Sequence, residues 1–211
     1  MTRVLLIRHG QSEWNADGRW QGQADPPLTD LGRQQALHAA RNLGVTDAIV
    51  ASDLQRATDT ALVLSNELGV GPIVVDEGLR ERDAGEWSGL TRAEIERRWP
   101  GYLDPSPADE RVGSPDGERR RPPSWESDEA LLVRVREALG RIHDLAPHGE
   151  VIVVTHGGVI YAIEGALGAP FDRLANLAGR WVEIGPGGEL RVLGERVVLV
   201  EPEERTVPSQ L

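Results

Sequence analysis

Short apolar runs and amphipathic stretches follow one another along most of the chain. Continuous runs of Val, Ile, Leu and Ala occupy residues 4–7, 48–50, 73–75 and 151–154, and such runs are typical of buried strands. Apolar residues at helical spacing occupy residues 29–43, 52–68, 91–99, 127–145 and 157–167. Because strands and helices alternate, the pattern predicts an α/β fold, a three-layer α/β/α arrangement with a mostly parallel central sheet.

Polar residues and glycines mark several helix ends. Ser52 and Asp53 are expected to cap the second helix, and Gly69 is expected to end it. Thr29 is expected to cap the first helix. The apolar stripe of that helix is predicted to consist of Leu31, Ala36, Leu37, Ala40 and Leu43.

Two segments depart from the alternation of strands and helices. Residues 104–126 contain five prolines and the basic run 119–121, which predicts a long irregular loop, either a functional lid or a disordered segment. Near the chain end, the turn sequence at 186–188 separates apolar runs at 181–184 and 190–200, which predicts a closing β-hairpin. We expect one domain over residues 1–200 and a frayed tail over residues 201–211.

Composition narrows the function classes. The chain has 211 residues and a formal net charge of −11, which argues against nucleic acid or an anionic membrane as partner. It has no cysteine, which excludes disulfides, thiolate metal sites and cysteine nucleophiles. No apolar run is long enough for a signal peptide or a membrane span, so a cytoplasmic location is expected.

Two histidines follow buried strands in the same way. Arg8-His9-Gly10 ends the first strand, and Thr155-His156-Gly157-Gly158 ends the fourth. Ligands of parallel sheets bind beyond the carboxyl ends of the strands, so both histidines should reach one edge, beside glycines that let a ligand approach the backbone. On spacing alone, an anion site and two structural histidines are equally acceptable interpretations, and an anion site does not separate a catalyst from a binding module.

These residue types suit phosphoryl chemistry. A neutral imidazole can attack phosphorus, and cationic groups can hold the phosphoryl oxygens. Arg8 adjoins His9, and Arg56 lies at the start of the helix after the second strand, so both guanidinium groups are expected at the same edge.

Four ordered motifs are similar to those of a known family. The segments LIRHGQSEWN (6–15), SDLQRATDTA (52–61), LRERDAGEWSG (79–89) and THGG (155–158) resemble the signatures of the histidine phosphatase superfamily, in its phosphoglycerate mutase-like branch. The resemblance implies a phosphohistidine on His9, a phosphate clamp of Arg8, Arg56 and His156, and Glu81 as proton donor and acceptor. It implies no metal and no other cofactor.

The resemblance also implies the substrate side of the site. The partner would be a small-molecule phosphomonoester, and a homodimer is compatible with the sequence. The residues expected to contact substrate are Asn15, Ser12, Gln21, Gly22, Arg82 and Gly157.

The family contains phosphatases, mutases and binding modules. The segment between the third and fourth motifs is modest in length and rich in proline, and it lacks a recognisable mutase pattern, which favours a broad-specificity phosphatase. Arg119-Arg120-Arg121 could instead serve a mutase by holding a second anionic group. The segment 124–127 departs from a Gly-Gly-Glu-Ser-like stretch of related phosphatases, which leaves the substrate open. Five tryptophans could supply walls for a ring-bearing substrate or simply core packing, namely Trp14, Trp20, Trp87, Trp99 and Trp125.

Overall fold

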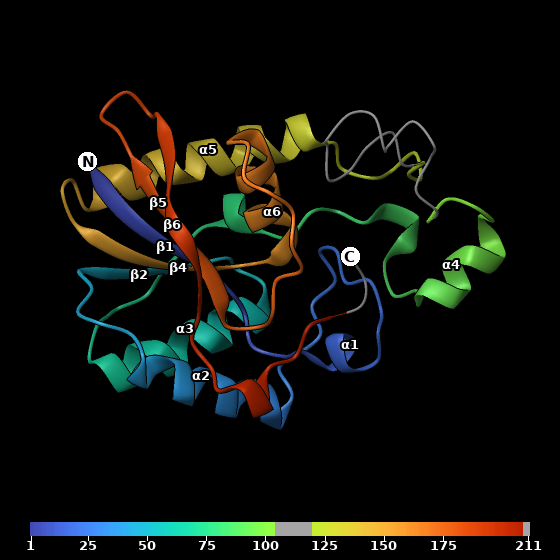
Figure 1. Ribbon diagram of the computed structural model, residues 1–211, viewed down its shortest axis with the longest axis horizontal. Helices are drawn as coiled ribbons and strands as arrows, with labels where there is room; N and C mark the ends of the chain where they lie inside the picture. The colour runs from blue at the N-terminus through green and yellow to red at the C-terminus, as the bar shows by residue number, and fades with distance from the viewer. Residues whose placement is uncertain (104–119, 209–211) are drawn as a thin grey trace.

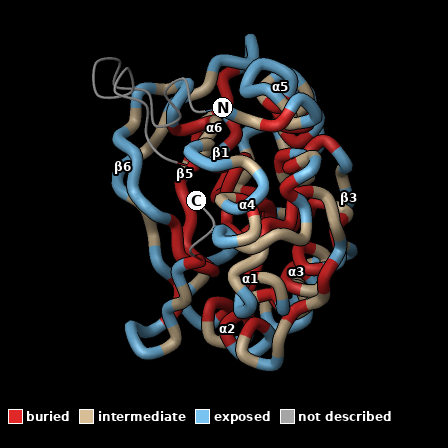
Figure 2. The backbone as a smooth tube through the Cα atoms, turned by 90° about the vertical axis from the view of Figure 1, so that its right-hand side faces the viewer, coloured by how far each residue is buried: buried red, intermediate tan, exposed pale blue. Residues whose placement is uncertain are grey.

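The computed structural model describes residues 1–103 and 120–208, and within them six strands form one sheet in the order β3-β2-β4-β1-β5-β6. The strands β1 (Thr2–Arg8), β2 (Ala48–Ala51), β3 (Val74–Val75) and β4 (Glu150–Thr155) run parallel. The predicted hairpin is formed by β5 (Ala178–Ile184) and β6 (Leu190–Val198), which pair antiparallel beside β1. Figure 2 shows that β5 is mostly buried and that β6, at the sheet edge, is half-buried to exposed.

Helices cover both faces of the sheet. α2 (Asp30–Arg41) and α3 (Gln55–Leu68) lie on one face, and α5 (Asp128–Leu145) and α6 (Gly157–Ala166) lie on the other (Figure 1). Alternate strand residues supply the two cores, because successive side chains of a strand point to opposite faces. Leu5 and Ile7 pack with α2 and α3, whereas Val4 and Leu6 pack with α5 and α6. The predicted three-layer α/β/α fold is confirmed.

A third apolar cluster lies beyond the carboxyl edge of the sheet. It brings together the turn after α1 (Glu13–Ala16), the 3₁₀ helix η2 (Gly85–Trp87) and α4 (Arg92–Arg98). Figure 1 labels α1 and α4. The 3₁₀ helix η1 (Glu77–Leu79) packs instead with α5, through Leu79. Its buried side chains are Trp20, Ala84, Trp87, Ile95 and Leu103, with Trp99 and Trp125 packed against them.

Two local predictions about helices were wrong. The N-cap of α3 is Leu54, whose apolar side chain cannot cap the helix. The Ser52 hydroxyl accepts from the Leu54 amide and contacts His156, and the Gln55 amide donates to Asp25. On α2, Leu37 is exposed, and the face against the protein interior carries the smaller Ala39 and the buried amide of Gln35. Small residues allow α2 and α3 to approach closely, which a stripe of leucines would prevent.

The ends of the irregular segments are held more firmly than predicted. Residues 201–208 form no frayed tail: η4 (Pro202–Glu204) is followed by Thr206, whose backbone accepts a hydrogen bond from Asn176. Glu126, at the end of the predicted loop, accepts hydrogen bonds from the Asp83 backbone and from the Arg134 guanidinium. Residues 104–119, including Arg119, and 209–211 lie outside the described residues. Among the described helices, none has the length and apolar character needed to cross a bilayer.

Candidate active site

The two histidines meet because their strands are neighbours in register. Arg8 of β1 pairs with Thr155 of β4, so His9 and His156 each stand one residue beyond the paired strand ends. Their ring centroids are 5.2 Å apart, and both residues are buried. The prediction that both strand-end histidines reach one edge of the sheet is therefore confirmed by the register.

Arg56 decides the tautomer of His9. Its Nε donates to His9 Nε2 at 3.2 Å, and because a guanidinium can only donate, Nε2 must carry a lone pair. The proton of the neutral ring then lies on Nδ1, which donates to the Gly10 carbonyl at 2.6 Å. The other nitrogens of Arg56 donate to the carbonyls of Ala24 and Gly22. His9 is thus held as a neutral imidazole with its Nε2 lone pair facing a cation.

Burial and neighbouring positive charge favour the neutral form of both histidines. Burial, together with the guanidinium groups of Arg56 and Arg8, holds the pKa of His9 well below its ordinary value. Burial is also the main reason why the pKa of His156 is lowered, with Arg56 as the next cause. Burial lowers the pKa of Arg56 to about 10, so the guanidinium remains charged at neutral pH.

His156 has one nitrogen engaged and one without a partner. Its Nε2 lies 2.9 Å from the Ser52 hydroxyl, at the carboxyl end of β2. Its Nδ1 is buried and makes no hydrogen bond within the described part of the chain. Buried polar groups without a partner are uncommon, and Nδ1 is therefore available to an oxygen of a bound ligand.

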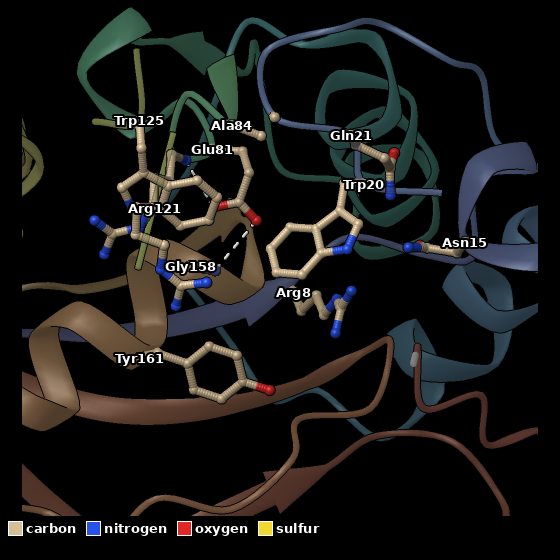
Figure 3. A pocket seen from close by; sticks show the side chains of 12 residues that line it. Arg8, Asn15, Trp20, Gln21, Glu81, Ala84, Arg121, Trp125, Gly158 and Tyr161 are labelled. Carbon is tan, nitrogen blue, oxygen red and sulfur yellow. Dashed lines mark hydrogen bonds between the residues drawn. The ribbon is translucent and has the colours of Figure 1, made fainter. Parts of the chain in front are cut away.

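Arg8 lines a pocket next to these buried groups. One of its terminal nitrogens donates to the Leu174 carbonyl at 2.8 Å, and its Nε is buried without a partner among the described residues. Figure 3 shows Arg8 facing Trp20, Asn15 and Tyr161 in this pocket. The remaining lining residues are Gln21, Gly22, Glu81, Arg82, Ala84, Arg121, Trp125 and Gly158.

Glu81 reaches the pocket from the loop after η1. Its Oε1 accepts from its neighbour's amide, that of Arg82, at 2.7 Å, and its Oε2 accepts from the Gly158 amide at 3.1 Å. Gly158 is in the first turn of α6, where free backbone N–H groups favour an anionic side chain. The structure thus brings Glu81, Arg8, Arg56, His9 and His156 together, although 147 positions separate His9 from His156.

The predicted substrate residues divide into two groups. Asn15, Gln21 and Gly22 line the pocket, as does Arg82. Ser12 instead caps α1: its hydroxyl accepts from the Asn15 amide and donates to Gln21 Oε1, and it does not line the pocket. Gly157 is buried at the start of α6, and its neighbour Gly158 lies on the pocket wall in its place.

Comparison with known proteins agrees with this geometry. Residues 4–188 match the profile of the histidine phosphatase superfamily (branch 1). The chain belongs to the histidine phosphatase superfamily. Glucosyl-3-phosphoglycerate phosphatase of Mycolicibacterium vanbaalenii is 38% identical over 203 residues, which cover 92% of this chain and 87% of that protein.

Further relatives include a mutase and a solved phosphatase. The probable phosphoglycerate mutase GpmB of Cronobacter sakazakii is 38% identical over 163 residues, covering 74% of this chain and 70% of that protein. The structure of a mycobacterial glucosyl-3-phosphoglycerate phosphatase in complex with VO3 superposes with a TM-score of 0.75 at 30% identity, covering 90% of this chain and 96% of that one. Phosphatases and mutases thus both occur among the relatives of this histidine phosphatase.

Sequence reasoning missed several residues that support the site in this histidine phosphatase. Arg134 of α5 donates to the carbonyls of Gly78, Arg80 and Glu81 and so holds the Glu81 loop. Nothing in the local pattern around Arg134 distinguishes it from a surface arginine. Asn176 is fully buried and donates a hydrogen bond to the His9 carbonyl. A polar asparagine inside the apolar run 174–178 could have indicated a buried residue with a structural or functional role.

Aromatic side chains form the outer wall of the pocket. Trp20, Trp87 and Trp125 pack edge to face, with ring centroids 5.3 to 5.7 Å apart, and Trp20 and Trp125 line the pocket. The Arg121 guanidinium lies 4.5 Å from the Trp125 ring centroid. Trp14 and Trp99 do not line the pocket. Within the described residues, no group of three or more His, Asp or Glu side chains is placed to hold a metal ion.

Proposed function

We propose that this histidine phosphatase hydrolyses phosphomonoesters through a phosphohistidine on His9. The observation that carries the proposal is the contact from Arg56 Nε to His9 Nε2, because it leaves a nucleophilic lone pair beside a permanent cation. A bound phosphoryl group would take over the Arg56 contact, and Arg8 Nε and His156 Nδ1, both without partners within the described residues, would bind its remaining oxygens.

In the first half-reaction, the lone pair on His9 Nε2 attacks phosphorus, and the bond from phosphorus to the ester oxygen breaks. The two arginines and His156 stabilise the charge on the phosphoryl oxygens. Glu81 gives a proton to the leaving oxygen, so the alcohol departs neutral. The carboxylate that remains is held by the amides of Arg82 and Gly158.

In the second half-reaction, water attacks the phosphohistidine. The Glu81 carboxylate takes a proton from this water, and the bond from phosphorus to Nε2 breaks. Phosphate leaves, and His9 returns to the neutral tautomer that Arg56 and Gly10 favour. The arginine side chains supply the charge compensation and His156 supplies a hydrogen bond, so the proposal includes no metal.

The pocket wall supports a substrate whose alcohol carries a ring. The indoles of Trp20 and Trp125 and the phenol of Tyr161 offer broad apolar faces in the pocket that Arg8 also lines (Figure 3). Sugar rings pack well on such faces, and a relative named glucosyl-3-phosphoglycerate phosphatase agrees with this substrate class. We also propose that the protein works in the cytoplasm, since a chain without cysteine needs no oxidising compartment. A homodimer remains a prediction.

Phosphate release from a panel of phosphomonoesters tests the proposal, with His9→Ala as the blank. The panel contains sugar phosphates, 3-phosphoglycerate, phosphoserine and an aryl phosphate. We expect release by the wild type, faster for ring-bearing alcohols, and none by His9→Ala. Release by the variant at a comparable rate would remove His9 from the nucleophile role.

A second candidate function is phosphoglycerate mutase activity. It is favoured by Arg82 and Arg121 on the pocket wall, where they could face a second anionic group. Arg82, however, is already paired with Asp128 and donates to the Glu126 carbonyl, so its charge is compensated. Isomerisation of 3-phosphoglycerate primed with its bisphosphate, without net phosphate release, would establish the mutase in place of the phosphatase.

A further inference from the structure

We propose that Thr206, in the C-terminal segment after η4, is a positioning residue of the active site. It acts through Asn176, which contacts both the His9 backbone and the Asn15 side chain. The proposal rests on the proposed function in one respect: His9 and Asn15 are assumed to face the phosphoryl group. The assignment follows from the direction of four consecutive hydrogen bonds.

The first bond of the series sets the orientation of the Gln35 amide. The Gln11 backbone N–H lies 2.9 Å from the Gln35 side chain, and because a backbone N–H can only donate, the atom it meets is Oε1. The Gln35 Nε2 group therefore points the other way, toward the C-terminal segment. It donates to the Glu204 carbonyl at 2.7 Å and to the Thr206 hydroxyl at 3.0 Å.

The Thr206 hydroxyl links the Gln35 amide to the Asn176 amide and sets the orientation of Asn176. Because it accepts from Gln35, its single proton is free to donate to Asn176 Oδ1, at 2.8 Å. The Asn176 backbone N–H donates to the Thr206 carbonyl at 2.9 Å, so the two residues are joined twice. With Oδ1 engaged by Thr206, the Nδ2 group of Asn176 must point toward the site.

Asn176 then contacts two elements of the active site. Its Nδ2 donates to the His9 carbonyl at 2.8 Å and to Asn15 Oδ1 at 3.2 Å. Asn15 Oδ1 also accepts from the Ser12 backbone N–H. Both donors approach the same oxygen, so the Asn15 Nδ2 group points toward the pocket as a donor, as Figure 3 shows. A phosphoryl oxygen requires such a donor.

Burial makes the series sensitive to the loss of one hydroxyl. Gln35 and Asn176 are both fully buried, so water cannot readily replace a missing partner. Removing the Thr206 hydroxyl leaves Asn176 Oδ1 and one Gln35 donor without that partner. The amide of Asn176 then loses the contact that selects its orientation, and the His9 backbone and Asn15 lose a fixed neighbour.

The C-terminal segment has a separate anchor that supplies a control. The Glu204 carboxylate pairs with His38 of α2 on the protein surface. This contact holds the segment and involves neither Asn176, His9 nor Asn15. Glu204→Gln weakens the attachment of the segment and leaves the series of hydrogen bonds intact, because Gln35 contacts only the Glu204 backbone carbonyl.

The test compares Thr206→Val, Thr206→Ser and Glu204→Gln in the full chain. Orthovanadate binding is followed by tryptophan fluorescence, ester turnover by phosphate release, and folding by thermal melting. We expect Thr206→Val to weaken orthovanadate binding and lower kcat/KM by about fivefold, the worth of one net hydrogen bond. Thr206→Ser keeps the hydroxyl and should match the wild type, and Glu204→Gln should change only the melting temperature.

Two results would overturn the proposal. One is wild-type orthovanadate affinity in a folded Thr206→Val, and the other is an equal kinetic loss in Thr206→Val and Glu204→Gln. If Thr206→Val does not fold, Thr206→Cys, with a weak S–H donor, should fall between valine and serine in affinity, and a wild-type affinity would count against the proposal. A wild type that binds orthovanadate but hydrolyses no ester would refute the proposed function and leave this test intact, whereas one that does neither would refute both.

Discussion

At the scale of single residues, the site works by restricting what each ionisable group can be. His9 is limited to one tautomer by a donor at Nε2 and an acceptor at Nδ1. Burial and two guanidinium groups hold its pKa, and that of His156, below the ordinary value. In the proposed mechanism, a neutral His9 needs no proton removed before it attacks phosphorus.

The lowered pKa values predict a pH-dependent stability. Below about pH 6.5, His9 and His156 bind protons in the unfolded chain but stay neutral in the folded chain. The free energy of unfolding therefore falls as the pH decreases. Each histidine contributes about 1.4 kcal/mol per pH unit in this range. Urea denaturation at pH 7.5 and 5.5 measures the loss, and His156→Asn should lose distinctly less than the wild type. An identical loss in both would contradict the lowered pKa of His156.

Glu81 is predicted to matter most for poor leaving groups. Glu81→Gln keeps the shape of the side chain but cannot give a proton to the leaving oxygen. We expect alkyl phosphates to be slowed by about 100-fold or more and an activated aryl phosphate much less. The ratio of kcat/KM on the two substrates measures the effect, and equal losses would remove Glu81 from the role of acid.

At the scale of elements, the start of α6 organises the catalytic edge. His156 occupies the N-cap position, and the Gly158 amide in the first turn holds the Glu81 carboxylate. A Cβ atom at Gly158 would overlap Glu81 Oε1, so only glycine permits this approach. The α5 helix supplies the second support, because Arg134 holds three carbonyls of the loop that carries Glu81.

Gly158→Ala is therefore predicted to displace Glu81. We expect a fall in kcat of about tenfold or more, because Glu81 must leave its place beside the leaving oxygen. Gly140→Ala is the matched control, since a Cβ atom at that position of α5 has open space. The control should raise the melting temperature without changing kcat, because alanine is favoured over glycine inside helices. Full activity in Gly158→Ala would show that Glu81 tolerates the shift.

At the scale of the whole molecule, the local charge of the site is opposite in sign to the net charge of the protein. The chain carries a net charge of −11, yet the edge of the sheet presents Arg8 from β1 and Arg56 from α3 beside His156. The two arginines come from different elements and are buried, so their field acts at short range on a bound anion and little at long range.

This assembly predicts activity without a divalent ion. Arginine supplies the positive charge that Mg²⁺ supplies in many other phosphoryl-transfer enzymes. We expect the rate to be unchanged by EDTA, measured as phosphate release with and without added Mg²⁺. A loss of activity that a divalent ion restores would require another mechanism.

The sequence alone determined the layered fold and the meeting of His9 with His156. Both follow from local periodicity and from the rule that parallel strands present their carboxyl ends at one edge. Tertiary structure alone decided the partners: Ser52 contacts His156, the Gly158 amide holds Glu81, and Thr206 reaches Asn176. It also placed Gly158, and not the predicted Gly157, on the pocket wall. Such contacts depend on strand register and helix packing, which join residues far apart in the chain. Apart from the asparagine inside the apolar run 174–178, these residues have no distinguishing local pattern.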